Sequence, residues 1–161
     1  MGDMPAIRLA TSADRTAIET IVREAYGIYI ARMGKEPGSM LDDYGALIGK
    51  RRVHVLDVDG KVLGLVVLIP EADVMLLDNV AVASEAQGKG YGRRLIEFAE
   101  DEARRQGFRF IRLYTNALMS ENLSLYSPLG YVETHRGEEK GFARVYLRKS
   151  LAGPEPEKRS I

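Results

Sequence analysis

The fold is decided by one stretch of the chain, DNVAVASEAQGKGYGRR, which spans residues 78–94. Its first half is apolar and typical of a buried β-strand, and residues 90–106 repeat their apolar side chains at helical spacing. The loop between them carries Gly88, Gly90 and Gly92 at alternate positions, and glycine lets a backbone come close to a ligand. The stretch therefore predicts a strand, a glycine-rich loop and the start of a long helix in direct succession.

The predicted start of this helix is suited to an anion. The first N–H groups of a helix have no partner inside it, and the helix dipole adds about half a positive charge there. Lys89, Arg93 and Arg94 bring further positive charge to the same place. We therefore expect a phosphate-binding site in this loop.

The glycine spacing narrows the kind of phosphate. A dinucleotide-binding fingerprint needs a glycine where this chain has Arg93, and a P-loop needs Ser or Thr after its lysine, where this chain has Gly90. The pattern that remains is Gln-x-x-Gly-x-Gly, filled by Gln87, Gly90 and Gly92. A tightly packed helix start without a ligand is the alternative interpretation of the same glycines.

Working outward, periodicity and turn residues predict the other elements. The pair Asp59-Gly60 indicates a two-residue hairpin, because both positions need a positive φ. The order β-α-α-β-β-β-α-β-α-β-β predicts a mixed sheet of the α/β (α+β) class. We expect one domain over residues 1–150 and a disordered tail over residues 151–161. The predicted strands are residues 6–10, 52–57, 61–70, 74–82, 108–115, 131–135 and 143–148, with a loop at 137–141, and the predicted helices are residues 13–33, 40–49, 90–106 and 120–127.

Composition argues against several classes of protein. The 161 residues contain 23 Lys and Arg against 23 Asp and Glu, so a net charge of zero gives no general attraction to nucleic acid or to an anionic membrane. No cysteine and two histidines argue against a transition-metal site and are compatible with a cytoplasmic location. The apolar run Val62–Ile69 is shorter than the ~20 residues of a membrane span, and the N-terminus lacks a signal-peptide pattern.

A second segment adds to the glycine motif. Residues 116–131 predict a short helix that ends in Tyr-x-x-Leu-Gly-Tyr, from Tyr126 to Tyr131. With Gln-x-x-Gly-x-Gly after an apolar strand, this segment resembles the GNAT superfamily of N-acetyltransferases. The resemblance covers about residues 7–148. It implies the GNAT-like acyl-CoA N-acyltransferase fold.

The resemblance implies that acetyl-CoA binds where the strand at 74–82 separates from the strand at 108–115. Backbone groups of Val80 and Val82, whose side chains are core valines in our interpretation, would pair with the pantetheine arm, and residues 87–92 would hold the diphosphate. Lys89 and Arg93 either reach phosphate oxygens or are solvated charges at the helix start. The implied cofactor residues are Val80, Ala81, Val82, Gln87, Gly88, Lys89, Gly90, Tyr91, Gly92, Arg93, Asn122 and Tyr126.

The resemblance also assigns catalytic roles. Tyr126 matches the tyrosine that protonates the departing thiolate, and a half-buried core aromatic is the alternative. Asp78 is our candidate for the base that takes a proton from the amine, since a carboxylate among apolar neighbours has a raised pKa. Ordered water is the alternative base, and Asp78 either binds a cationic acceptor or pairs with an arginine in the other interpretations.

The acceptor pocket is expected from the first two helices and the last hairpin. Tyr26, Tyr29 and Tyr44 would line it, unless they are core residues. We expect an N-acetyltransferase that acts on a primary amine of a small molecule by direct transfer. A non-catalytic acyl-CoA sensor and a protein N-acetyltransferase are the alternatives. Many members of the family dimerise, and the sequence leaves a homodimer open.

Overall fold

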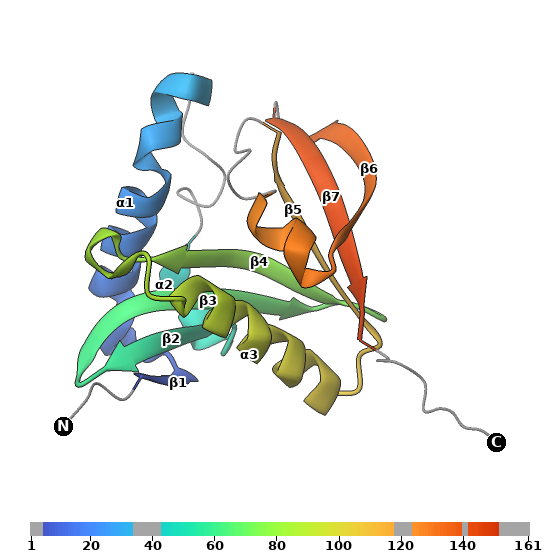
Figure 1. The fold of residues 1–161 in the computed structure, drawn as a ribbon. Coiled ribbons are helices and arrows are strands. Elements are labelled where there is room, and N and C mark those ends of the chain that lie inside the picture. The colour runs from blue at the N-terminus through green and yellow to red at the C-terminus, as the bar shows by residue number, and fades with distance from the viewer. Residues whose placement is uncertain (1–4, 34–42, 118–123, 140–141, 152–161) are drawn as a thin grey trace. The chain divides into compact units, whose positions relative to one another are not determined.

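The computed structural model describes residues 5–33, 43–117, 124–139 and 142–151. The described elements follow the predicted order, and the neighbouring strands of the mixed sheet are β1-β2-β3-β4-β5-β7-β6 (Figure 1). The predicted α/β class is confirmed. The strands are β1 (Pro5–Leu9), β2 (Val53–Val58), β3 (Lys61–Pro70), β4 (Met75–Val82), β5 (Phe110–Asn116), β6 (Val132–Glu139) and β7 (Phe142–Ser150), and the α-helices are α1 (Arg15–Met33), α2 (Tyr44–Gly49) and α3 (Tyr91–Arg105).

The chain falls into two compact units. The first comprises residues 1–69 and 77–99, and the second comprises residues 70–76 and 100–161. The single domain expected over residues 1–150 stays a prediction. Within the described residues, no helix is both long and apolar enough to cross a membrane.

The first unit contains an antiparallel sheet built on the predicted hairpin. β1 pairs with β2 from Pro5↔Val58 to Leu9↔His54, and β2 pairs with β3. Asp59 and Gly60, with φ of 53° and 88°, make the turn between β2 and β3 and confirm the hairpin. Apolar side chains of the sheet and of α1 are fully or almost fully buried, among them Val53, Val55, Leu65, Val67, Ile18 and Val22.

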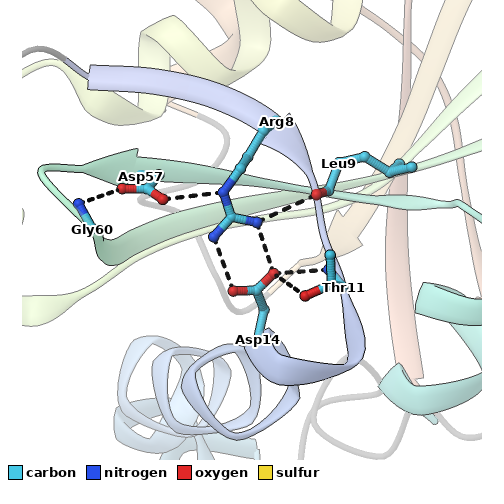
Figure 2. A network of polar contacts seen from close by, with 6 residues as sticks. All are labelled: Arg8, Leu9, Thr11, Asp14, Asp57 and Gly60. Carbon is cyan, nitrogen blue, oxygen red and sulfur yellow. Dashed lines mark hydrogen bonds and ion pairs between the residues drawn. The ribbon is translucent and has the colours of Figure 1, made fainter.

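A polar network holds the start of the chain in this unit (Figure 2). Two guanidinium nitrogens of Arg8 donate to the Asp14 carboxylate at 2.8 and 3.0 Å, and its Nε donates to Asp57 at 3.0 Å. Asp14 also accepts the backbone N–H of Thr11 at 2.8 Å. The hydrogen bonds and charge of Arg8 lower the pKa of Asp14 to about 2. The network joins β1, the residues before α1 and the β2–β3 hairpin.

The second unit contains β5, β7 and β6. β5 pairs antiparallel with β7 from Phe110↔Ser150 to Asn116↔Arg144. The parallel pairing with β4 is described at Met75↔Ile111 and Leu76↔Arg112. The buried side chains of the second unit include Ile111, Leu113, Val145 and Leu147.

The last hairpin corrects two boundaries. We predicted a loop over residues 137–141, but β6 continues to Glu139, which pairs with Phe142. The sequence there is charged because β6 is the last strand in the sheet order, and such strands need no apolar residues on an exposed face. The disordered tail was expected to begin at Leu151, and this was wrong. Leu151 is buried, and its N–H donates to the carbonyl of Arg109 at 2.8 Å.

The starts of the two short predicted helices, residues 40–42 and 120–123, lie outside the described residues. α2 begins at Tyr44, and the Asp43 carboxylate caps it by accepting the backbone N–H of Ala46 at 3.0 Å. Residues 40–42 of the predicted helix lie outside the described residues. Of the helix predicted over residues 120–127, residues 124–126 are helical and a 3₁₀ turn, Ser127–Leu129, follows.

Candidate active site

The glycine-rich loop of the first unit has an open backbone. Gly88 and Gly90 have φ of 85° and 81°, a region that favours glycine, and a Cβ added at either would meet nothing within 4 Å. A Cβ on Gly92 would lie 3.9 Å from a methyl of Val82. The Gly90 carbonyl accepts the N–H of Arg94 at 3.1 Å, so α3 starts directly after the loop.

Side chains around the loop are mostly exposed. Lys89, Arg93 and Arg94 are exposed, and none of these three has an ion-pair partner among the described residues. Tyr91 is buried in the core at the start of α3. The Gln87 amide lies 3.5 Å from the carbonyl of Val82. Open backbone, a helix start and three exposed cations together suit an anionic group.

Residues 77–82 of β4, which belong to the first unit, present two different faces. Leu77, Asn79 and Ala81 are buried, whereas Asp78, Val80 and Val82 are half-buried. The interpretation of Val80 and Val82 as core valines is therefore wrong. The candidate base Asp78 shares its face with Val80, as the alternation of side chains along a strand predicts.

The sequence analysis missed Asn79, a buried residue of this strand that bonds two tyrosines. The Tyr26 hydroxyl donates to the Asn79 Oδ1 at 2.5 Å, and the Asn79 amide donates to the Tyr44 hydroxyl at 3.0 Å. The Tyr26 hydroxyl also lies 3.2 Å from the carbonyl of Val80. An asparagine at an inward position of an apolar strand was the available signal, because a buried amide needs partners.

Asn79 links two of the three tyrosines that we expected at the acceptor. Tyr44 is only 2% exposed, which agrees with the alternative of a core tyrosine. Tyr26 is half-buried. The side chain of Tyr29 lies outside the described residues, as does Asn122.

Tyr126 lies in the second unit, just before the 3₁₀ turn at Ser127–Leu129. The residue is 7% exposed, and its ring meets the ring of Tyr131 edge-on, with centroids 5.5 Å apart. Burial raises the pKa of the Tyr126 phenol above its usual value. The phenol is therefore neutral near pH 7 and is able to donate a proton or a hydrogen bond.

Comparison with known proteins settles the family. The acetyltransferase (GNAT) family model matches residues 16–131, and the chain belongs to this family. Over 136 residues the chain is 26% identical to the uncharacterized N-acetyltransferase YjgM of Escherichia coli (strain K12), covering 79% of this chain and 81% of that protein. We therefore assign it acetyl-CoA-dependent acyltransferase activity, and the predicted family is confirmed.

Solved structures share the fold. The ribosomal-protein-S18-alanine N-acetyltransferase from Escherichia coli has a TM-score of 0.75 at 20% identity, and the match covers 98% of this chain and 100% of that chain. The structure of yncA from Salmonella typhimurium with its cofactor acetyl-CoA has a TM-score of 0.69 at 22% identity, covering 94% and 98%. No group of His, Cys, Asp or Glu within the described ranges is arranged to hold a metal ion.

Proposed function

We propose that this chain moves an acetyl group from acetyl-CoA directly to the primary amine of a small molecule. The observation that carries the proposal is the loop before α3, where Gly88 and Gly90 adopt positive φ with open space beside them. Backbone N–H groups there suit the diphosphate of CoA, with the side chains of Lys89 and Arg93 near the phosphates. The yncA structure, which has this fold and holds acetyl-CoA, supports the choice of cofactor.

The pantetheine arm is assigned to the outward face of β4. The half-buried positions Val80 and Val82 leave that face partly accessible, and a backbone N–H near Val80 would stabilise the developing oxyanion. The side chain of Ala81 lies on the buried face of the same strand, so its backbone rather than its side chain is assigned to this site. Gln87, Tyr91 and Gly92 complete the proposed cofactor residues on this side, and Asn122 stays a prediction from the resemblance.

The chemical step is direct transfer. The amine nitrogen attacks the thioester carbonyl, the C–N bond forms, and the C–S bond breaks with its electron pair on sulfur. We assign the proton for this thiolate to the Tyr126 phenol, which burial keeps neutral. The proton released by the amine goes to Asp78 or to water, and the half-buried place of Asp78 on the face of Val80 supports Asp78.

The acceptor is assigned to the class of small primary amines. Tyr26 is the better candidate for an acceptor contact because it is half-buried, whereas Tyr44 is in the core, and Tyr29 stays a prediction. A protein N-terminus is the second candidate, because a neighbour of the same fold is an acetyltransferase for a ribosomal-protein alanine. A cytoplasmic location and a homodimer stay predictions of the sequence.

Two measurements test the function. Calorimetry with acetyl-CoA should give saturable binding at one site. Assays of free CoA thiol should then show turnover with small amines and little with peptides that have free N-termini; with no cysteine in the chain, a thiol reagent reports CoA without background. Turnover with peptides alone would favour the protein substrate. Binding without turnover on either set would favour the sensor, and no binding would contradict the proposal.

A further inference from the structure

A buried carboxylate lies on the inward side of α3 in the second unit. Glu100 is only 6% exposed, although it belongs to a helix whose other acidic residues in this unit are more exposed. Its two oxygens have different partners. Oε2 accepts the hydroxyl of Tyr131 at 2.9 Å, and Oε1 accepts the ammonium of Lys149 at 3.0 Å. A buried carboxylate with both oxygens bonded is costly to disturb.

Tyr131 connects this carboxylate to Tyr126. The two rings meet edge-on at 69°, an arrangement that aromatic pairs prefer. The Tyr131 N–H also points to the Tyr126 carbonyl at 3.4 Å, across a turn in which Gly130 has a φ of 97°. Ring and backbone of Tyr131 therefore both contact Tyr126.

Lys149 closes the arrangement from β7. Its ammonium lies 5.6 Å from the centre of the Tyr131 ring, and its side chain lies 3.4 Å from where a Cβ on Gly130 would be. The Tyr131 ring is thus held at its hydroxyl by Glu100 and lies beside the side chain of Lys149.

The orientation of the Tyr126 phenol depends on this packing. Among the residues that the structure describes, none makes a hydrogen bond to its hydroxyl. Within the described part of the chain, ring contacts and its own backbone therefore set its direction. We therefore expect a shift of the Tyr131 ring to move the Tyr126 hydroxyl as well.

We propose that Glu100 is a positioning residue that acts through Tyr131 to aim the hydroxyl of Tyr126 at the sulfur of acetyl-CoA. The proposal rests on the proposed function. Glu100 is not proposed to contact a reacting atom. Its hydrogen bond holds the Tyr131 ring in place, and the Tyr131 ring in turn orients the side chain of Tyr126. Loss of Glu100 should lower kcat while the KM for acetyl-CoA changes little, because the binding groups lie elsewhere in the chain.

The central test is a double-mutant cycle between Glu100→Leu and Tyr126→Phe. Leucine cannot accept a hydrogen bond, and misplacement of a catalytic group by an ångström is enough to cost a rate severely, so we expect kcat to fall roughly tenfold. In the Tyr126→Phe background the same change should cost no further rate, because the hydroxyl to be aimed is already gone. An equal loss of rate in both backgrounds would overturn the proposal.

Milder variants keep the test valid if Glu100→Leu does not fold. Glu100→Gln should retain near-normal kcat. The oxygen of the glutamine amide can accept from the Lys149 ammonium, and its N–H can donate to the hydroxyl oxygen of Tyr131. Tyr131→Phe deletes the hydroxyl alone and should lower kcat about threefold, again only when Tyr126 is present. A Tyr131→Phe protein with unchanged kcat would contradict the proposal.

The control is Glu71, another carboxylate of this unit that bonds a cation. Glu71 accepts from Arg112 at 2.8 and 3.0 Å, so Glu71→Leu also takes a carboxylate partner away from a cation. We expect it to lower the melting temperature with kcat unchanged. Loss of kcat in this control would mean that general loosening explains the effect. A wild-type protein without transferase activity would overturn both proposals, whereas an additive cycle in an active enzyme overturns this one alone.

Discussion

The tyrosines that we singled out for the candidate site are held differently in the two units of this protein. In the first unit, Tyr26 and Tyr44 both bond to the buried amide of Asn79. In the second unit, the hydroxyl of Tyr126 has no hydrogen-bond partner among the described residues and is held by ring packing. A phenol whose proton is already in a hydrogen bond has little capacity to protonate a reacting group, whereas a buried neutral phenol whose proton is not so engaged keeps it available.

The same contrast extends to how each unit is expected to act. The first unit offers backbone, in the loop at Gly88 and Gly90 and along β4, and backbone binding tolerates changes of side chain. In our proposal the second unit contributes the hydroxyl of Tyr126. Variants should therefore separate binding from chemistry according to the unit that they change.

The largest expected effect comes from Tyr126→Phe. Loss of a general acid costs about 10²-fold or more, so kcat should fall by that factor, while calorimetry should show near-normal affinity for acetyl-CoA. Tyr44→Phe is the control, since it removes a phenol that lies in the core. Unchanged turnover in Tyr126→Phe would remove its acid role and end the contrast between the units.

Asn79→Leu tests the first unit. Leucine has the same branched arrangement of heavy atoms as asparagine but bonds neither tyrosine, and leaving buried polar groups without that partner should lower the free energy of unfolding by about 2 kcal/mol in urea titrations. The kcat of the folded protein should remain close to normal. If kcat fell while stability held, the hydroxyl of Tyr26 or Tyr44 would take part in the chemical step itself, and the contrast would be wrong.

These residues also show what the sequence could predict. The hairpin at Asp59-Gly60 and the start of α3 followed from local rules, since φ preferences and apolar spacing act over a few residues. The roles of Asn79 and Glu100 were not predicted because their partners are distant in the chain. The partners of Asn79 lie 35 and 53 positions away, and those of Glu100 lie 31 and 49 positions away. A sequence pattern shows that a polar residue is out of place, but it does not show what satisfies it.

Boundaries failed for a related reason. Charged residues at the end of β6 resembled a loop, and Leu151 resembled part of a polar tail. Glu139 is ordered by its pairing with Phe142 at the start of β7, and Leu151 by a backbone hydrogen bond to the distant residue Arg109. The candidate acid Tyr126 was found from a family motif, whereas the residues that hold it needed the structure.

Gly90→Val tests the backbone site. Valine is strained at a φ of 81° and places a side chain in the open space beside the loop, so the affinity for acetyl-CoA should fall about tenfold or more. Gly60→Val is the matched control, because Gly60 has a φ of 88° and equally open space, but lies in the β2–β3 turn. It should lower stability and leave calorimetric affinity unchanged. Equal loss of affinity in both variants would mean that strain, not the site, is responsible.

The smallest expected effect is the pH dependence of the stability that the Arg8–Asp14 pair gives to the first unit. Because the pKa of Asp14 falls from 3.8 to about 2 on folding, its pairing with Arg8 contributes stability above pH 4 that is lost as the pH falls toward 2. The Arg8 side chain is 40% exposed, so water screens the pair and we expect about 1 kcal/mol. Urea titrations of wild type and Asp14→Asn should differ by a constant amount above about pH 5 and converge below pH 4. A difference that stayed constant down to pH 2 would show that Asp14 titrates alike in the folded and unfolded protein. The network at Arg8 would then act through its shape alone, and the first unit would owe none of its stability to that charge.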